Sequence, residues 1–153
     1  MKVGEQKRIP ATRPGEKQKR HVFGGYNWKQ DTMTWTVATT KNSSTFIEFL
    51  EKLLVKTYPT GRVVLVMDNA SYHKSASALA ALSLFEHRVM SFWLPAYCSD
   101  LNPIERFWRH LKDLACANKL EDNIETVVQN AETVLAKQNA PDSPLRFHVS
   151  KDL

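Results

Sequence analysis

The fold prediction starts from residues 63–69, VVLVMDN, where five apolar residues are followed directly by an aspartate and an asparagine. A continuous apolar run of this length is typical of a strand that is buried on both faces, as strands in parallel pairs are. A second run of strand length, VMSFWL, covers residues 89–94 and is closed by Pro95. The Ala-rich stretch between the two runs, residues 75–85, predicts a helix. These segments together predict a strand–helix–strand unit with two neighbouring strands.

The segments on either side of this unit complete the predicted order of elements. Aromatic and β-branched runs predict strands over 21–26 and 34–39, joined by a hairpin loop at 27–32. A capping-box pattern at 45–48 predicts the start of a helix that ends at 58–61, YPTG. Two more helices are predicted, from Asn102 to Ala115 and over 124–136. The order β-β-α-β-α-β-α-α predicts an α/β fold, a mixed sheet with flanking helices.

The composition is that of a globular protein of about one domain. The chain has 153 residues, of which 42% are hydrophobic and 24% charged, so a disordered chain and a disulfide scaffold are excluded. No apolar run approaches the roughly 18 residues of a membrane span, and the N-terminus shows no signal-peptide pattern. Cys98 and Cys116 are far apart and are predicted to be free thiols. We therefore expect a cytoplasmic protein without a membrane partner.

The net charge of +5 is concentrated in residues 1–20, which hold seven basic and two acidic side chains. Pro10 and Pro14 interrupt this segment, which predicts a loop or an extended arm. A basic arm can neutralise phosphates, and a solvated leader without a partner is the alternative. The predicted DNA-binding residues are Lys2, Lys7, Arg8, Arg13, Lys17, Lys19 and Arg20.

Two carboxylates stand out by their positions in the predicted elements. Asp68 follows a central strand, where ligands of open α/β sheets gather, although Asp68 and Asn69 could simply turn the chain or cap the next helix. Glu105 is the third residue of a predicted helix, where it could complete a capping box with Asn102. If strands 63–67 and 89–94 are neighbours, both carboxylates reach the same end of the sheet. Two such oxygen ligands suit Mg²⁺ or Mn²⁺ and metal-assisted phosphoryl chemistry.

Two motifs around these carboxylates resemble those of a known family. Residues 68–73, DNASYH, resemble the second-aspartate motif of mariner-type DDE transposases. Residues 94–108, LPAYCSDLNPIERFW, resemble the third-carboxylate motif of the same family, and the Glu is typical of its bacterial insertion-sequence branch. The family usually has Ser-Pro where this chain has Cys98-Ser99, which changes the loop but not the carboxylate. The resemblance covers about residues 20–120.

The resemblance implies an RNase H-like fold and a site in which three carboxylates bind two divalent metal ions, Mg²⁺ or Mn²⁺. It implies hydrolysis at the ends of a DNA element, followed by strand transfer into target DNA. The implied partners are therefore element ends and target DNA. On this basis Asp68 and Glu105 are the catalytic and metal-binding residues. The residues expected near the site are Asn69, His73, Asp100 and Asn102.

The first aspartate of the family has no counterpart in the predicted elements. Asp31 is the only aspartate before Asp68, and it lies in the hairpin loop, remote from a site at strand ends. The basic residues 1–20 look like the loop that joins the family's first strand to its second. We therefore expect the C-terminal part of a DDE catalytic domain without its first strand: an arm at 1–20, an RNase H-like domain at 21–140 that is incomplete at its N-terminus, and a tail at 141–153.

Three functions are compatible with this interpretation. The first is a fragment of a DDE transposase that hydrolyses and transfers DNA strands and associates with DNA of the nucleoid. The second is an inactive remnant that binds only DNA or protein, as a homo-oligomer or with an intact transposase. The third is an unrelated α/β protein in which Glu105 only caps a helix. The missing first aspartate separates the first two.

Overall fold

The computed structural model describes residues 2–3, 7–10, 18–116 and 123–142. The strands are β1 (Lys2–Val3), β2 (Lys7–Pro10), β3 (Lys19–Asn27), β4 (Thr32–Ala38), β5 (Val63–Met67) and β6 (Val89–Trp93). The helices are α1 (Ser43–Glu51), which continues as the π-helical segment Lys52–Thr57, α2 (Ala76–Ser83), α3 (Ile104–Cys116) and α4 (Ile124–Gln138). Two 3₁₀ turns cover Ser71–His73 and Ser99–Leu101.

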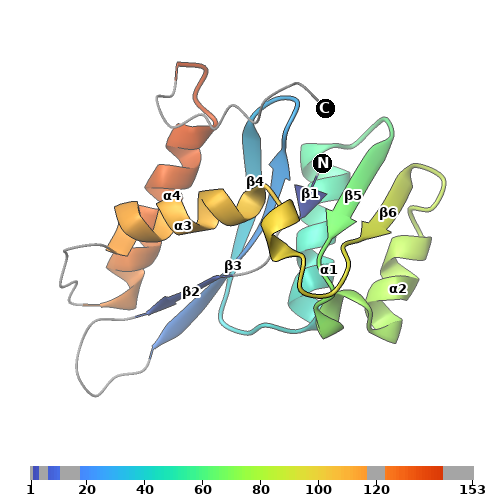
Figure 1. Cartoon of the computed structure of the whole chain (residues 1–153), viewed down its shortest axis with the longest axis horizontal. Helices are drawn as coiled ribbons and strands as arrows, with labels where there is room; N and C mark the ends of the chain where they lie inside the picture. Colours follow the sequence, from blue (N-terminus) through green and yellow to red (C-terminus); the bar gives the residue numbers. More distant parts are fainter. Residues whose placement is uncertain (1, 4–6, 11–17, 117–122, 143–153) are drawn as a thin grey trace.

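The six strands form one mixed sheet, seen in Figure 1. The long antiparallel pair β3–β4 runs from His21 opposite Ala38 to Asn27 opposite Thr32. The parallel pair β5–β6 keeps one register throughout, with Val63 opposite Val89. The short strand β1 joins the two pairs, because it is antiparallel to β3 and parallel to β5. β2 pairs with the first half of β3.

The predicted element order is confirmed from β3 to α4, and the predicted loop over residues 1–20 is wrong in part. β1, β2 and the start of β3 are strands, because the backbone groups along β3 and β5 need hydrogen-bond partners that a short segment can supply. β1 also fills the expected gap in the sheet, although neither of its residues is a carboxylate. Arg13 and Lys17 lie outside the described residues.

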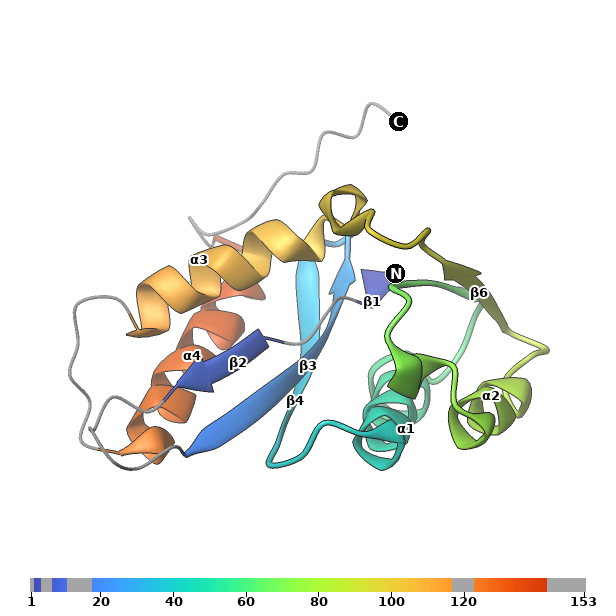
Figure 2. The same cartoon turned by 60° about the horizontal axis from the view of Figure 1, so that its bottom comes forward.

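Two packed cores lie on the two faces of the sheet. Figure 2 shows α3 and α4 on one side of β3 and β4, and α1 and α2 on the other. One core gathers residues of α1, β5 and α2 around Phe46 and Phe49. The other gathers residues of β3, α3 and α4 around Trp108. Apart from their end residues, α3 and α4 match the predicted helices.

β5 was predicted to be buried on both faces and β6 to be a second buried strand, and the structure corrects both expectations. Leu65 and Met67 are buried against α1, but Val64, Met90 and Phe92 are 44%, 59% and 52% exposed. The reason is that β6 is an edge strand and that α3 and α4 pack on β3 and β4 rather than on this end of the sheet.

The start of α1 also differs from its prediction. Asn42, not Thr45, is the N-cap: its side chain accepts a hydrogen bond from the Thr45 N–H at 3.0 Å, and the Thr45 hydroxyl accepts one from the Asn42 N–H. Asn is at least as good a cap as Thr, so the helix begins three residues earlier than the capping-box pattern suggested.

Asp31 lies at the tip of the β3–β4 hairpin, as predicted, where it ties the hairpin to α4. Its backbone is left-handed, with φ of 56°, and its Oδ1 accepts hydrogen bonds from the Tyr26 hydroxyl and from Gln138 Nε2. Burial and the adjacent Asp31 carboxylate raise the pKa of Tyr26. Asp31 thus has a structural role in this hairpin.

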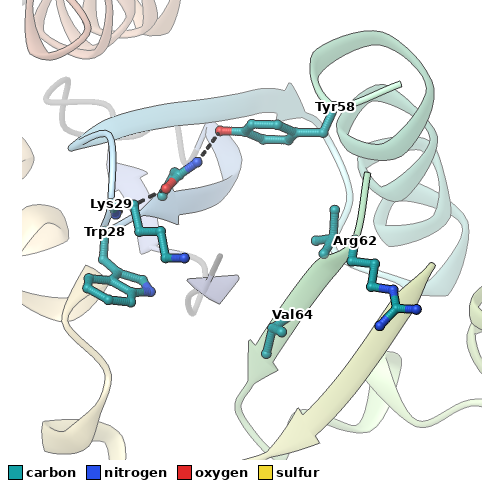
Figure 3. A pocket seen from close by; sticks show the side chains of 7 residues that line it. Trp28, Lys29, Tyr58, Arg62 and Val64 are labelled. Atoms are coloured by element: carbon teal, nitrogen blue, oxygen red, sulfur yellow. Dashed lines mark hydrogen bonds between the residues drawn. The ribbon is translucent and has the colours of Figure 1, made fainter. Parts of the chain in front are cut away.

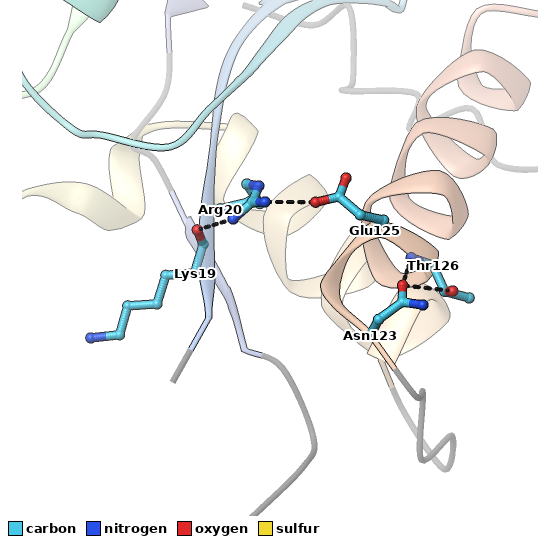
Figure 4. A network of polar contacts seen from close by, with 5 residues as sticks. All are labelled: Lys19, Arg20, Asn123, Glu125 and Thr126. Atoms are coloured by element: carbon cyan, nitrogen blue, oxygen red, sulfur yellow. Dashed lines mark hydrogen bonds and ion pairs between the residues drawn. The ribbon is translucent and has the colours of Figure 1, made fainter. Parts of the chain in front are cut away.

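Arg20, one of the predicted DNA-binding residues, is bound to α4 (Figure 4). Its guanidinium lies 2.6 Å from Glu125 Oε1 and also donates to the Lys19 carbonyl at 3.1 Å. Figure 4 shows the Lys19 side chain directed away from this pair. Because Glu125 is largely exposed, the ion pair contributes at most about 1 kcal/mol to stability.

Candidate active site

Asp68 lies directly after β5, in a turn that holds its carboxylate. Its Oδ1 accepts the Ala70 N–H at 3.0 Å and lies 2.9 Å from His73 Nδ1. The side chain is 19% exposed and lines a cavity of about 190 Å³ together with Asn69, Ala70 and residues 94–98. Asp68 does not cap α2, since Ser75 holds that position. The residue therefore shapes a turn and also faces a cavity.

The charge on Asp68 is stabilised by its surroundings. Burial alone would raise the pKa of this carboxyl, but the hydrogen bonds from His73 and from the Ala70 N–H, with the nearby charge of Lys41, lower it below its ordinary value. The side chain is therefore a carboxylate at neutral pH, the form that binds a metal ion.

This lowered pKa predicts a pH-dependent contribution to stability. A carboxyl whose pKa is lower in the folded state stabilises the fold above its unfolded value of 3.8, and this contribution is lost as pH falls through the folded value. With a chelator present, Asp68→Asn should lower the free energy of unfolding more at pH 6 than at pH 3. Urea denaturation at both pH values measures this, and an equal loss at the two would contradict it.

Glu105 lies in the first turn of α3 and lines a second cavity. This cavity, of about 310 Å³, is also lined by Asp100, Asn102, Arg106 and Arg109. The Glu105 N–H donates to the Asn102 carbonyl at 3.0 Å. The Asn102 side chain is 2% exposed, and neither its Oδ1 nor its Nδ2 has a hydrogen-bond partner within the described part of the chain. The Asn102 half of the predicted capping box is therefore not formed.

The two carboxylates line neighbouring cavities rather than one. The loop that lines the Asp68 cavity, residues 94–98, runs directly into the 3₁₀ turn and the start of α3. Figure 1 shows this connection beside the end of β5. Among residues 2–3, 7–10, 18–116 and 123–142, no three His, Cys, Asp or Glu side chains form a group that could hold a metal ion. That Asp68 and Glu105 share an ion therefore stays a prediction.

Two arginines beside Glu105 were not identified from the sequence. Arg106 and Arg109 are exposed and line the same cavity as Glu105. Because they alternate with the apolar residues of α3, their sequence pattern is that of an ordinary solvent-exposed helix face. The available signal was spacing, because Arg109 follows Glu105 by four residues and so lies on the same side of the helix.

A larger cavity, of about 370 Å³, lies at the other end of β5 (Figure 3). It is lined by Trp28, Lys29, Arg62 and Val64 among others, and Asn27 Nδ2 donates to the Tyr58 hydroxyl at 3.0 Å across it. Its lining contains no carboxylate, and it lies at the start of the strand that Asp68 follows. We therefore place the candidate active site at Asp68 rather than here.

The mixed sheet with helices on both faces is an RNase H-like fold of the kind found in transposase and integrase catalytic domains. The chain belongs to the family described as DDE superfamily endonuclease, whose model matches residues 1–128. The predicted resemblance to DDE transposases is thereby confirmed. None of the helices in the described residues has the length and apolar character needed to cross a bilayer.

Individual relatives agree with the family. The Insertion element IS630 uncharacterized 39 kDa protein of Shigella sonnei is 26% identical over 115 residues, which is 75% of this chain and 33% of that protein. The chain thus spans about a third of the length of this relative.

Solved structures of Mos1 transposase share the fold. The catalytic domain of Mos1 mariner transposase has a TM-score of 0.69 at 22% identity, over 88% of this chain and 69% of that one. The Mos1 paired-end complex with left transposon end has a TM-score of 0.71 at 20% identity, over 93% and 48%. The Mos1 catalytic domain with Raltegravir and Mn has a TM-score of 0.68 at 21% identity, over 88% and 70%.

Proposed function

We propose that this chain forms part of the catalytic domain of a DNA transposase, with Asp68 and Glu105 as carboxylate ligands of Mg²⁺ or Mn²⁺. The observation that carries the proposal is the placement of Asp68: an ionised carboxylate at the end of a central strand, facing a cavity, in a chain of the DDE endonuclease family. The relatives support a DNA substrate, because Mos1 is seen with a transposon end. They support a divalent metal, because the Mos1 catalytic domain is seen with Mn.

The donor set around Asp68 and Glu105 suits such an ion. Carboxylate oxygens are the ligands that Mg²⁺ and Mn²⁺ prefer. When bound, these ions activate a water or 3′-hydroxyl oxygen and stabilise the leaving oxygen of a phosphodiester. Asp68 Oδ1 already accepts two hydrogen bonds, which leaves Oδ2 for the ion. Arg106 and Arg109 supply positive charge for a DNA phosphate beside Glu105.

Among the described residues, no three His, Cys, Asp or Glu side chains form a group that could hold a metal ion, although Asp100 lines the Glu105 cavity. β1 lies beside β5 but brings Lys2 and Val3, and Asp31 is bound at the hairpin tip. With two carboxylates, we expect one weakly held ion, because Mg²⁺ gives up its waters reluctantly. The chain alone should therefore cleave DNA poorly.

An inactive remnant that only binds DNA or an intact transposase is the second candidate. It is favoured by the separate cavities of Asp68 and Glu105. The DNA directly upstream of the gene distinguishes the two: an in-phase or frameshifted segment encoding a strand with an aspartate supports a catalytic domain, and its absence supports a remnant.

Manganese binding tests the proposed function. The purified chain should bind Mn²⁺ weakly, as measured by water-proton relaxation. Asp68→Ala and Glu105→Ala should each abolish this binding, while Asp142→Ala, an exposed carboxylate at the end of the described chain, should not. Binding that survives in both site variants would refute the assignment.

A nicking assay on double-stranded DNA that carries element ends completes the test. Little cleavage by the chain is expected. Strong metal-dependent cleavage that both site variants abolish would show that a third carboxylate is present, and Asp100, which lines the Glu105 cavity, would be the first to examine.

A further inference from the structure

The His73 ring is held rigidly inside the core next to Asp68. Its exposed fraction is zero, and its centroid lies 4.5 Å from that of Phe46 and 4.4 Å from that of Tyr72. Phe46 comes from α1, whereas Tyr72 is the preceding residue in the 3₁₀ turn. Contacts from two elements leave the imidazole no room to swing away, so its nitrogens have fixed directions.

The two ring nitrogens have different surroundings. Nδ1 lies 2.9 Å from Asp68 Oδ1 and 3.4 Å from the Asp68 carbonyl oxygen. Because a carboxylate only accepts hydrogen bonds, Nδ1 carries the proton of this contact. Nε2 is buried and has no hydrogen-bond partner within the described residues, where an N–H would be left unsatisfied at a cost. Nδ1 is therefore the nitrogen that donates to Asp68, whereas Nε2 makes no such contact within the described residues.

We propose that His73 is a positioning residue that fixes the Asp68 carboxylate in one orientation. Its Nδ1–H and the Ala70 N–H both donate to Oδ1, so the carboxylate is held at one oxygen. Oδ2 is then the oxygen available to a ligand in the cavity lined by Asn69 and residues 94–98. Partners of this kind orient metal-binding carboxylates in other proteins. The orientation of Asp68 does not depend on the proposed function. Only its consequence, metal binding, rests on that function.

The alternative is that His73 only fills space in the core. Two substitutions separate the roles. His73→Phe keeps an aromatic ring between Phe46 and Tyr72 but removes the donor. His73→Asn removes the ring that packs against Phe46 and Tyr72 but provides an amide N–H close to the position of Nδ1–H. Phe46→Leu is the matched control, because it loosens the packing around His73 and leaves the donor in place.

The side-chain rotamer of Asp68 about its Cα–Cβ bond, which the hydrogen bonds to Oδ1 restrict, is measured without metal by the scalar couplings of its β-protons in the full chain. We expect couplings of a single rotamer in the wild type, in His73→Asn and in Phe46→Leu, and averaged couplings in His73→Phe. Averaged couplings in the wild type, or a single rotamer in His73→Phe, would overturn the proposal. So would averaging in Phe46→Leu equal to that in His73→Phe, since packing alone would then explain the effect.

The functional consequence is measured as the affinity for Mn²⁺. His73→Phe should weaken binding by about 10–100-fold, the usual effect of losing such a partner, and His73→Asn should restore most of it. Unchanged affinity in His73→Phe would overturn the metal-binding role of the orientation. If the wild type binds no Mn²⁺, the proposed function fails, while the scalar couplings still decide whether His73 orients Asp68.

Discussion

Trp108→Ala is expected to lower the free energy of unfolding by about 3–5 kcal/mol, the usual cost of removing a large buried aromatic side chain. Trp108 is fully buried, stacks edge-on with Phe107 at 5.8 Å and is the largest side chain of the core between β3, α3 and α4. A loss of this size is a large part of the roughly 5–15 kcal/mol that stabilises a domain. Urea denaturation measures it.

Leu114→Ala in the same helix is the control for this prediction. Leu114 is 42% exposed, so its truncation should cost well below 2 kcal/mol. Equal losses at Trp108 and Leu114 would show that α3 does not pack on the sheet as described.

Gly24 tests the same contact from the side of the sheet. A Cβ at Gly24 would lie 2.5 Å from Trp108 Cη2 and 2.7 Å from Cζ2, so Gly24→Ala should destabilise the wild type by about 1–3 kcal/mol through overpacking. In a Trp108→Leu background this cost should shrink, because the indole ring that clashes is gone. A cost that is the same in both backgrounds would place its cause elsewhere.

Neutralising part of the basic segment is expected to change how DNA binding depends on salt. The N-terminal cations were proposed to contact phosphates, and each such contact contributes about 0.9 to the slope of log affinity against log salt concentration. The triple variant Lys7→Gln, Arg8→Gln, Lys19→Gln should therefore lower the slope by about 2.7. Substitution is preferable to deletion of residues 1–20, because β1 and β2 pair with β3 and their loss would damage the sheet.

A second triple variant with the same change in net charge controls for general electrostatics. It changes three exposed lysines elsewhere in the chain: Lys29→Gln, Lys56→Gln and Lys137→Gln. Fluorescence anisotropy with a labelled duplex at several salt concentrations gives both slopes. If the two variants lower the slope equally, the N-terminal cations have no special role in binding DNA.

The sequence predicted the elements whose identity depends on local pattern. The apolar run at Val63–Met67 predicted a strand, and helices were predicted to start near Ser75 and at Ile124, close to where α2 and α4 begin. It did not predict β1 and β2, because their pairing depends on a distant strand, β3, and their own residues lack a strand pattern. The exposure of Met90 and Phe92 could not be foreseen for a related reason, since only the placement of α3 and α4 decides which part of the sheet is covered.

The candidate site was predicted to a similar extent. The motifs made Asp68 and Glu105 the candidates, and their positions at a strand end and a helix start follow from local sequence. His73 was expected near the site, but its contact with Asp68 was not predicted, since it requires the turn Ser71–His73 to fold the chain back. The two arginines of α3 were missed because a cavity beside a helix is a property of several elements at once.

The two cores on opposite faces of the sheet have a consequence for the spacing of the carboxylates. Asp68 is anchored through His73 to the core around Phe46, whereas Glu105 belongs to a helix anchored by Trp108 in the other core. The distance between the two carboxylates therefore depends on the sheet that joins the two cores. Substitutions deep in either core, far from any ligand, can misalign the pair without touching it.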